Sequence, residues 1–417
     1  LAHLDALLDK GCQITADGHY KSIYKTTSER QSVSLGALSV GRIGIVGKGV
    51  AACQFASTIA IRYSCVRRQF GPPTKDELTV WSYPLQRHRL LPYLGAAFVL
   101  RLFHKRLYDH FADYMMQVMT GEKSDTLAAL SKEVHGLSSV AKPVSTWIGN
   151  EALTEARRAC GGHGFLHLSR LNELKDDADP SQTFEGENNI LLQQTSNWLL
   201  GLQTFKSPLE TVNFLQNREP AFSKFSSNTL QDVLAAYRWL ARHLLDQTAA
   251  AVKSELAAGR DEWTARNNTQ VHTAHNLSRV YGEHTILKWF SDAVDALTCA
   301  RQREILTNLG VVFAVQRLET HLADLYIGGY TTGAQFGQGL RERQAAAENA
   351  LANEAAALVD AIAPHDFLLN SALGASDGRA YEHIMAEFES RKDFIPSWTS
   401  DLSQFLQNRQ KHFQSKL

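Results

Sequence analysis

Cysteine is scarce in this sequence, which has five in 417 residues. The number is odd, the spacings are wide and no CxxC pair occurs, which excludes a disulfide framework or a zinc ribbon and predicts reduced thiols in an intracellular protein. No HExxH motif occurs, and His272 and His275 have no carboxylate cluster beside them, so we expect no metal site. The cysteines are Cys12, Cys53, Cys65, Cys160 and Cys299.

An excess of either charge is also missing, since Lys+Arg and Asp+Glu both total 43. This balance excludes nucleic acid or an anionic membrane as a bulk partner, although a local basic cluster can still hold a phosphorylated cofactor. No stretch approaches the roughly 18 uninterrupted apolar residues of a transmembrane helix. We therefore expect no membrane span.

Helical patterns dominate what is present. Residues 44–68 are mostly small and apolar, which favours a helix that packs closely on its neighbours, and Gly71-Pro72-Pro73 ends it. Residues 161–184 contain many Gly and Asp and are predicted to form a long loop. Further helices are predicted at 84–119, 124–141, 145–160 and 188–200, and beyond residue 228 at 269–299, 304–325, 335–362, 379–390 and 400–413.

The predicted fold is mainly α, with two consecutive helical bundles after a short remnant of a β-domain. We place the remnant at 1–37, the first helical domain at 38–203 and the second at 229–417. The Pro-, Ser- and Asn-containing stretch 204–228 is the predicted linker, and a capping-box-like start at Thr229 opens the second block.

Three clusters could carry chemistry. The first is Arg67-Arg68-Gln69-Phe70-Gly71, where an arginine could contact a pyrophosphate in a bidentate manner. The second is 160–165, Cys-Gly-Gly-His-Gly-Phe, whose glycines allow close backbone approach to a ligand. The third is 183–188, Thr-Phe-Glu-Gly-Glu-Asn, which precedes a helix. Taken singly, Glu185 is an ordinary first-turn carboxylate and Arg67 an ordinary solvated helix end, both favourable to the helix dipole.

Together and in this order the three clusters resemble the acyl-CoA dehydrogenase and oxidase superfamily. The longer matches at 56–71, 155–165 and 176–200 resemble the peroxisomal acyl-CoA oxidases, closest to the type-3, branched-chain (pristanoyl) branch. The shorter dehydrogenases lack the second helical block, which favours an oxidase. The two alternatives are an acyl-CoA dehydrogenase that uses an electron-transfer flavoprotein, and a non-catalytic helical dimerisation fragment.

The resemblance implies roles for individual residues. Glu185 matches the base that removes the α-proton of the acyl thioester; FAD takes the β-hydrogen as hydride, and O2 becomes H2O2. Arg42 and Gly186 match positions at the acyl-CoA site. FAD, near the interface of a homodimer, is expected to contact Arg67, Phe70, Gln86, Arg158, Gly161, Gly162, Glu187 and Asn189.

The two ends of the sequence carry expectations of their own. Ser415-Lys416-Leu417 is the address read by the peroxisomal import receptor, so we expect a peroxisomal protein. Residue 1 is Leu, with no signal or transit peptide before it, and we expect the chain to begin partway through a longer protein. The domains that the superfamily places earlier would supply much of the flavin and acyl pocket.

Overall fold

The computed structural model describes residues 1–8, 11–23, 27–73, 75–121, 124–392, 394 and 396–414. The predicted targeting residues Ser415, Lys416 and Leu417 lie outside these ranges.

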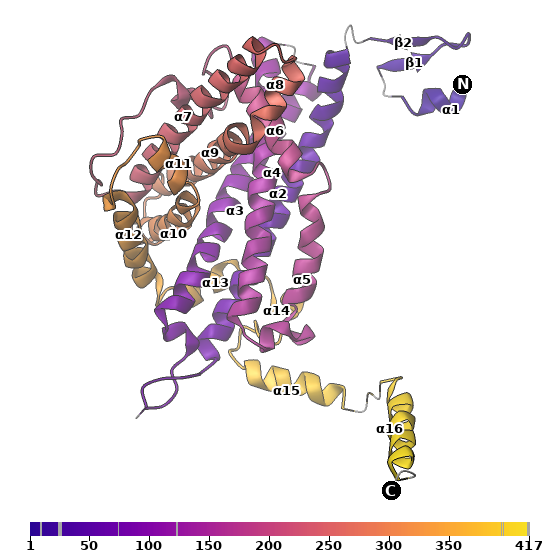
Figure 1. The fold of residues 1–417 in the computed structure, drawn as a ribbon, viewed down its shortest axis with the longest axis vertical. Coiled ribbons are helices and arrows are strands. Elements are labelled where there is room, and N and C mark those ends of the chain that lie inside the picture. The colour runs from indigo at the N-terminus through magenta and orange to yellow at the C-terminus, as the bar shows by residue number, and fades with distance from the viewer. Residues whose placement is uncertain are drawn as a thin grey trace.

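The first helical block consists of long helices that run side by side along the molecule (Figure 1). The small residues of α2 allow this contact, because a Cβ on Gly49 would lie 2.5 Å from the Ser145 carbonyl oxygen of α4. The backbones of α2 and α4 therefore approach closely. The block contains α2 (Thr27–Val66), η1 (Val80–Ser82), α3 (Pro84–Met119), α4 (Asp125–Ala159), η2 (His163–Phe165), η3 (His167–Ser169), α5 (Leu171–Ala178), η4 (Asp179–Gln182) and α6 (Asn188–Leu200).

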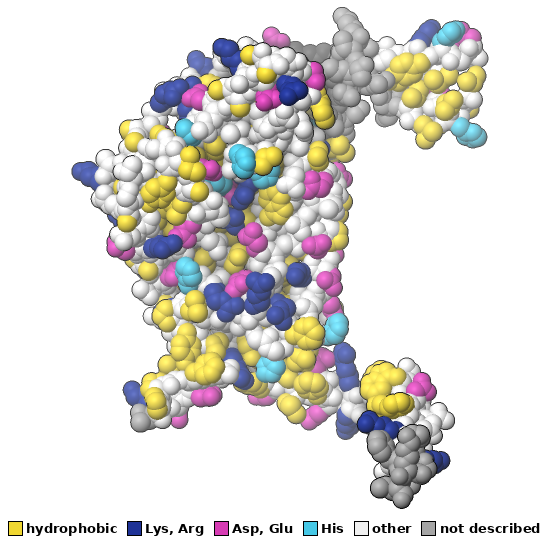
Figure 2. Space-filling view, in the orientation of Figure 1, with side chains coloured by type: hydrophobic (Ala, Val, Ile, Leu, Met, Phe, Trp, Pro, Cys, Tyr) yellow, Lys and Arg dark blue, Asp and Glu magenta, His cyan; other side chains and the backbone are white. Residues whose placement is uncertain are grey.

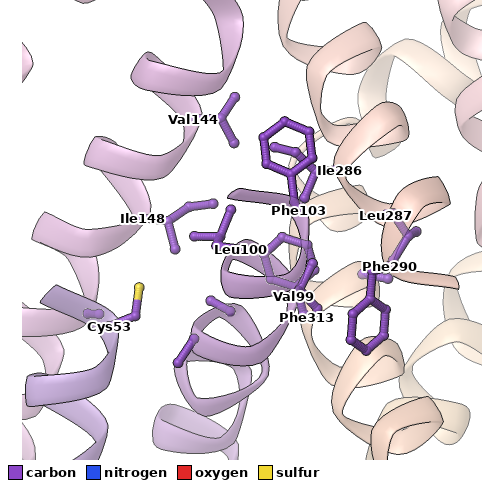
Figure 3. Close-up of a cluster of buried hydrophobic side chains, with 14 of the residues drawn as sticks. Cys53, Val99, Leu100, Phe103, Val144, Ile148, Ile286, Leu287, Phe290 and Phe313 are labelled. Atoms are coloured by element: carbon purple, nitrogen blue, oxygen red, sulfur yellow. The ribbon is translucent and has the colours of Figure 1, made fainter. Parts of the chain in front are cut away.

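The second block packs on the first through one continuous apolar core. Figure 3 shows Phe103 of α3 and Ile148 of α4 in the same cluster as Phe290 and Phe313 of the second block. These side chains are almost fully buried, so the two blocks stabilise each other by removing apolar surface from water. The second block contains η5 (Asn213–Gln216), α7 (Thr229–Ala257), α8 (Glu262–Asn268), the π-helix η6 (Gln270–Ala274), α9 (His275–Asp295), α10 (Ala300–Glu319), α11 (Leu322–Ile327), α12 (Gln335–Leu351), α13 (Ala355–Ile362) and α14 (Asp366–Leu369).

Both ends of the chain project from this body (Figure 1). At the N-terminal end, α1 (Ala2–Ala6) precedes an antiparallel pair, β1 (Cys12–Ile14) and β2 (Tyr20–Ser22). At the other end lie α15 (Ala380–Ser390) and α16 (Thr399–Gln414). Figure 2 shows hydrophobic side chains gathered on the lower projection, where Trp398 and Phe405 are exposed.

The structure corrects several sequence-based boundaries. Residues 161–184 are not a long loop, because α5 and three single-turn 3-10 helices fill them and bury Leu171 against the bundle. The helices predicted at 124–141 and 145–160 are one helix, α4, which contains Pro143. Burial on both sides of Pro143 compensates for the hydrogen bond that proline removes. Helix α2 begins at Thr27, before the expected start of the helical domain, and Asn228 rather than Thr229 caps α7.

The segment predicted as a linker is fixed to the first block by a buried carboxylate. Glu133 of α4 accepts hydrogen bonds from the Ser207 hydroxyl (2.5 Å), the Leu209 amide (2.8 Å) and both the amide and hydroxyl of Thr211 (3.2 and 2.5 Å). Tyr281 of α9 donates to the same Thr211 hydroxyl at 2.7 Å. Residues 207–211 therefore connect the two blocks as a packed strap.

Residues 38–66 of α2 are long and apolar enough to cross a membrane by length and composition alone. In the bundle, 67% of that apolar window is buried, which is the behaviour of a core helix. The expected absence of a membrane span stays a prediction.

Candidate active site

Glu185 lies in a sharp turn between η4 and α6. Its φ is 56° and that of Gly186 is 101°, so two successive residues adopt left-handed backbone conformations. Such a conformation is costly for a residue with a side chain and persists only where the surroundings hold it. The turn lays the Glu185 side chain over α2, at Gly41.

Gly41 provides the space for the carboxylate. A Cβ at this position would lie 2.8 Å from Glu185 Cδ and 2.9 Å from Oε1, closer than van der Waals contact allows. Glycine at position 41 therefore lets the Glu185 carboxylate lie directly on the helix. Nothing in the sequence around Gly41 distinguished it from the other small residues of α2.

Arg42 holds the backbone of the turn. Its side chain is buried, and Nε donates to the Glu185 carbonyl oxygen at 3.3 Å while Nη1 donates to Ser139 Oγ at 3.2 Å. Burial lowers the pKa of Arg42, and the Glu185 carboxylate partly opposes that shift. The residue predicted at the acyl-CoA site thus lies beside the predicted base and binds its main chain.

Lys142 binds the carbonyl oxygen of Gly186, the residue after Glu185. The sequence did not identify Lys142 as a residue of this site. Its Nζ donates to the Gly186 carbonyl oxygen at 2.6 Å and to Asn188 Oδ1 at 3.0 Å, and Asn188 donates in turn to Thr146 Oγ1. Burial lowers the pKa of Lys142 to about 8, against the opposing effect of the Glu187 carboxylate. The only sequence signal was a single lysine within the apolar run 140–144.

Glu187 and Asn189 are joined at the start of α6. Glu187 caps the helix by accepting hydrogen bonds from the amides of Asn189 (3.0 Å) and Ile190 (3.2 Å), and it also accepts from Asn189 Nδ2 (2.8 Å). The Asn189 amide oxygen lies 3.2 Å from His275 Nε2. This edge borders a hollow of about 320 Å³ lined by Val144, Trp147, Ile148, Glu151, Asn189, His275, Arg279, Glu283 and Arg317.

The other predicted cofactor residues gather at the opposite end of the first block. Gly161 has a φ of 59°, and a Cβ on either Gly161 or Gly162 would meet nothing within 4 Å, so this turn faces open space. Phe70, with a φ of 63°, is 69% exposed. Arg158 is largely exposed, 3.7 Å from Glu155. An open glycine turn, which allows close approach of a ligand, with arginines beside it suits the pyrophosphate of a dinucleotide such as FAD.

Gln86 differs from the other predicted cofactor residues, because its side-chain amide forms hydrogen bonds that join neighbouring helices. Nε2 donates to Ser64 Oγ of α2 and to the Ala159 carbonyl oxygen of α4, both at 3.0 Å, and the side chain is buried. These contacts join α2, α3 and α4 beneath the glycine turn. Its predicted contact with the cofactor stays a prediction.

The two groups of predicted residues are far apart in one chain. Gly41, under Glu185, and Arg67 lie 26 positions apart along α2 and the residue that follows it. At about 1.5 Å per residue this is roughly 39 Å. The base and Arg67 therefore lie toward opposite ends of the bundle (Figure 1).

Comparisons with known proteins cover both helical blocks. Residues 35–200 match the family described as "Acyl-CoA oxidase, C-alpha1 domain", and residues 229–407 match that described as "Acyl-CoA oxidase". The chain is 54% identical over 414 residues to acyl-coenzyme A oxidase acox-3 of Caenorhabditis elegans, which covers 98% of this chain and 62% of that protein. It is 39% identical over 416 residues to peroxisomal acyl-coenzyme A oxidase 3 of Homo sapiens, with 95% and 59% covered.

A solved structure shows the same fold. Acyl-CoA oxidase-1 of Caenorhabditis elegans, complexed with FAD and ATP, matches 97% of this chain and 59% of its own chain with a TM-score of 0.84 at 22% identity. The chain therefore spans about three fifths of the length of the relatives it matches.

Proposed function

We propose, because this chain belongs to the acyl-CoA oxidase family, that it supplies the catalytic base and part of the cofactor site of an enzyme that oxidises fatty acyl-CoA to trans-2-enoyl-CoA. The observation that carries the proposal is the Glu185 turn. Its carboxylate lies on Gly41, and two buried cations, Arg42 and Lys142, bind its successive carbonyl oxygens. A general base needs such a fixed position before its pKa matters.

In this proposal the Glu185 carboxylate takes the α-proton of the acyl thioester. The Glu185 backbone N–H, fixed by the same turn, donates to the thioester carbonyl and stabilises the developing enolate. FAD, when bound, supplies the acceptor of the β-hydrogen as hydride and the path of the electrons to O2, which becomes H2O2. Glu185 is exposed in this chain, so the bound acyl group and further protein would have to exclude water from it.

We propose a homodimer because the two groups of residues lie far apart within one chain. A single extended FAD does not reach from Glu185 to Arg67 along one bundle. Two copies side by side in opposite directions would each place their Arg67 and Gly161 end beside the partner's base end. We therefore propose that each flavin contacts the Glu185 end of one chain and the Arg67, Phe70, Arg158, Gly161 and Gly162 end of the other.

The likeness to acox-3 and to human peroxisomal acyl-coenzyme A oxidase 3 supports an oxidase of the type-3 branch rather than a dehydrogenase. Ser415-Lys416-Leu417 supports location in the peroxisome, through the import receptor. Because the chain spans about three fifths of its relatives, we expect it to bind FAD weakly by itself.

The test is Glu185→Gln in the complete gene product, with Glu210→Gln as a control. Glu210 is also an exposed glutamate at positive φ, 58°, but lies in the 207–211 strap. We expect peroxide release from acyl-CoA and O2 to collapse in Glu185→Gln while flavin content survives, and to persist in Glu210→Gln. Full activity of Glu185→Gln would refute the assignment of Glu185 as the catalytic base. Oxidation of acyl-CoA that requires an added electron acceptor would favour a dehydrogenase.

A further inference from the structure

The end of the second helical block packs against the C-terminal end of α2, which directly precedes Arg67. Arg62 of α2 donates from Nε to Asp360 Oδ1 at 3.0 Å and from Nη1 to the Gly374 carbonyl oxygen at 2.7 Å. Gly374 lies so close to α2 that a Cβ would be 3.0 Å from Ile59 Cγ1. The chain after α13 is therefore fixed on α2, a short distance before Arg67.

The same segment is bound on its other side by the chain that follows the glycine turn. The Ala372 amide donates to the Leu168 carbonyl oxygen at 2.9 Å, and Ser371 Oγ donates to the Ser169 carbonyl oxygen at 2.8 Å. Arg170 Nη1 donates to the Leu368 carbonyl oxygen at 2.8 Å. Contacts to both α2 and η3 set the position at which α15 begins.

Tyr381 of α15 lies beside Arg67, so that its hydroxyl contacts the guanidinium. Arg67 Nη1 donates to the Tyr381 hydroxyl at 3.0 Å, and Nη2 donates to Gln69 Oε1 at 3.2 Å. Both partners are neutral, and within the described ranges Arg67 forms no ion pair with a carboxylate. Two of its five N–H groups are thus oriented by neutral partners, and the Glu77 carboxylate acts on Arg67 only through space, so the remaining donors are free to bind an anionic ligand.

Tyr381 in turn packs against a hydrogen-bonded pair of side chains, Tyr63 and His163. Tyr63 and His163 are joined by a hydrogen bond of 2.7 Å between the Tyr63 hydroxyl and His163 Nδ1, and the His163 ring meets Tyr381 edge-on at 6.5 Å between centroids. Burial raises the pKa of Tyr63 to about 12, and burial together with the nearby Arg67 lowers the pKa of His163, so this is a hydrogen bond between two neutral side chains. His163, directly after Gly161-Gly162, thereby links the glycine turn to α15.

We infer that Tyr381 is a positioning residue: it extends from α15, which follows the second helical block, and orients the Arg67 guanidinium toward the pyrophosphate of the flavin. The inference rests on the proposed function, in which Arg67 contacts that pyrophosphate. It gives the chain after the second block a role in cofactor binding, through a residue outside the three sequence motifs.

The test measures FAD affinity in the complete gene product, stripped of flavin and titrated with FAD while the quenching of flavin fluorescence is followed. Four proteins are compared: wild type, Tyr381→Phe, Arg67→Ala and the double variant. Tyr381→Phe keeps the ring against His163 and removes only the hydroxyl. Tyr108→Phe, an exposed tyrosine of α3, is the control.

We expect Tyr381→Phe to weaken FAD binding about tenfold, the loss of one hydrogen bond to a charged group. In the Arg67→Ala background the same substitution should change the affinity less than twofold, because interacting residues are non-additive. Tyr108→Phe should leave the affinity unchanged, and thermal unfolding should show that all variants fold.

The inference is overturned if Tyr381→Phe has no effect, or if its effect is equally large without Arg67, which would indicate a general structural role. An unchanged affinity in Arg67→Ala would instead refute the assignment of Arg67 in the proposed function, and the inference with it. Loss of peroxide production in Glu185→Gln tests that function separately, so the two failures are distinguishable.

Discussion

Lys142 Nζ donates a hydrogen bond of 2.6 Å to the Gly186 carbonyl oxygen, across 44 positions of sequence. The ammonium is buried in α4, where a charge is costly unless it is paired or hydrogen-bonded. Its position fixes the residue after Glu185, so the long helix α4 determines where the proposed base points.

Lys142→Met removes this contact and keeps a long apolar side chain. The cost of the lost hydrogen bonds is partly offset by the removal of a buried charge, so we expect stability to change by less than about 2 kcal/mol. The turn loosens, and kcat should fall about 10–100-fold through misplacement of the base. Steady-state peroxide production measures this, with Lys132→Met, exposed on the same helix, as the control. Unchanged kcat would show that Lys142 does not position Glu185.

Gly41→Ala should separate stability from activity. Alanine favours a helix over glycine by up to about 1 kcal/mol, but the new methyl group lies where the Glu185 carboxylate is. The carboxylate, at the end of a flexible side chain, should move aside, so we expect the melting temperature to hold or rise while kcat falls about 10–100-fold. Gly44→Ala is the matched control, because a Cβ there meets nothing within 4 Å. Equal activity of the two variants would contradict the prediction.

Glu133→Gln should weaken the strap between the blocks. The carboxylate accepts four hydrogen bonds from residues 207–211, and an amide would direct its own N–H groups at some of those donors. We expect a loss of about 2–4 kcal/mol in the free energy of unfolding, measured with urea. Glu342→Gln, exposed on α12, should cost almost nothing. A similar loss in both variants would argue against the strap.

His284 should make stability depend on pH. Burial lowers its pKa to about 3 in the folded chain, with Arg238 and Lys288 adding to the shift, and both ring nitrogens lack a partner within the described chain. The unfolded value is about 6.5, so below pH 6.5 the unfolded chain takes up a proton that the folded chain does not. Protonation of His284 in the unfolded chain therefore leaves the free energy of unfolding almost unchanged at pH 7. At pH 5 it lowers that free energy by about 2 kcal/mol, since each pH unit below 6.5 contributes about 1.4 kcal/mol.

His284→Leu removes the titrating group and keeps the site apolar beside Phe214. The difference in urea unfolding free energy between pH 7 and pH 5 should shrink by about 2 kcal/mol relative to wild type. Replacing the exposed His272 by Gln is the control. The same pH dependence in wild type and His284→Leu would contradict the assignment.

Much of the fold could be predicted from local patterns. The ends of α3 and α6 lie where the periodicity and the flanking residues placed them. The errors occurred where packing overrides local preference. The gap predicted between helices 124–141 and 145–160 is absent, because α4 continues through Pro143. The Gly- and Asp-containing stretch 161–184 was predicted to be a loop, but burial of Leu171 stabilises α5 there.

The sequence by itself determined the residue types that the chemistry needs: a glutamate before a helix, a glycine turn and an arginine at a helix end. These are local motifs, and their order along the chain is sufficient to identify them. Only the tertiary structure decided what holds them. The contacts of Gly41 with Glu185, of Lys142 with Gly186 and of Tyr381 with Arg67 each join residues at least 44 positions apart, and nothing near them in sequence records those contacts. Packing of α2 against α4, and of the second block against the first, creates those contacts, so they exist only in the folded chain.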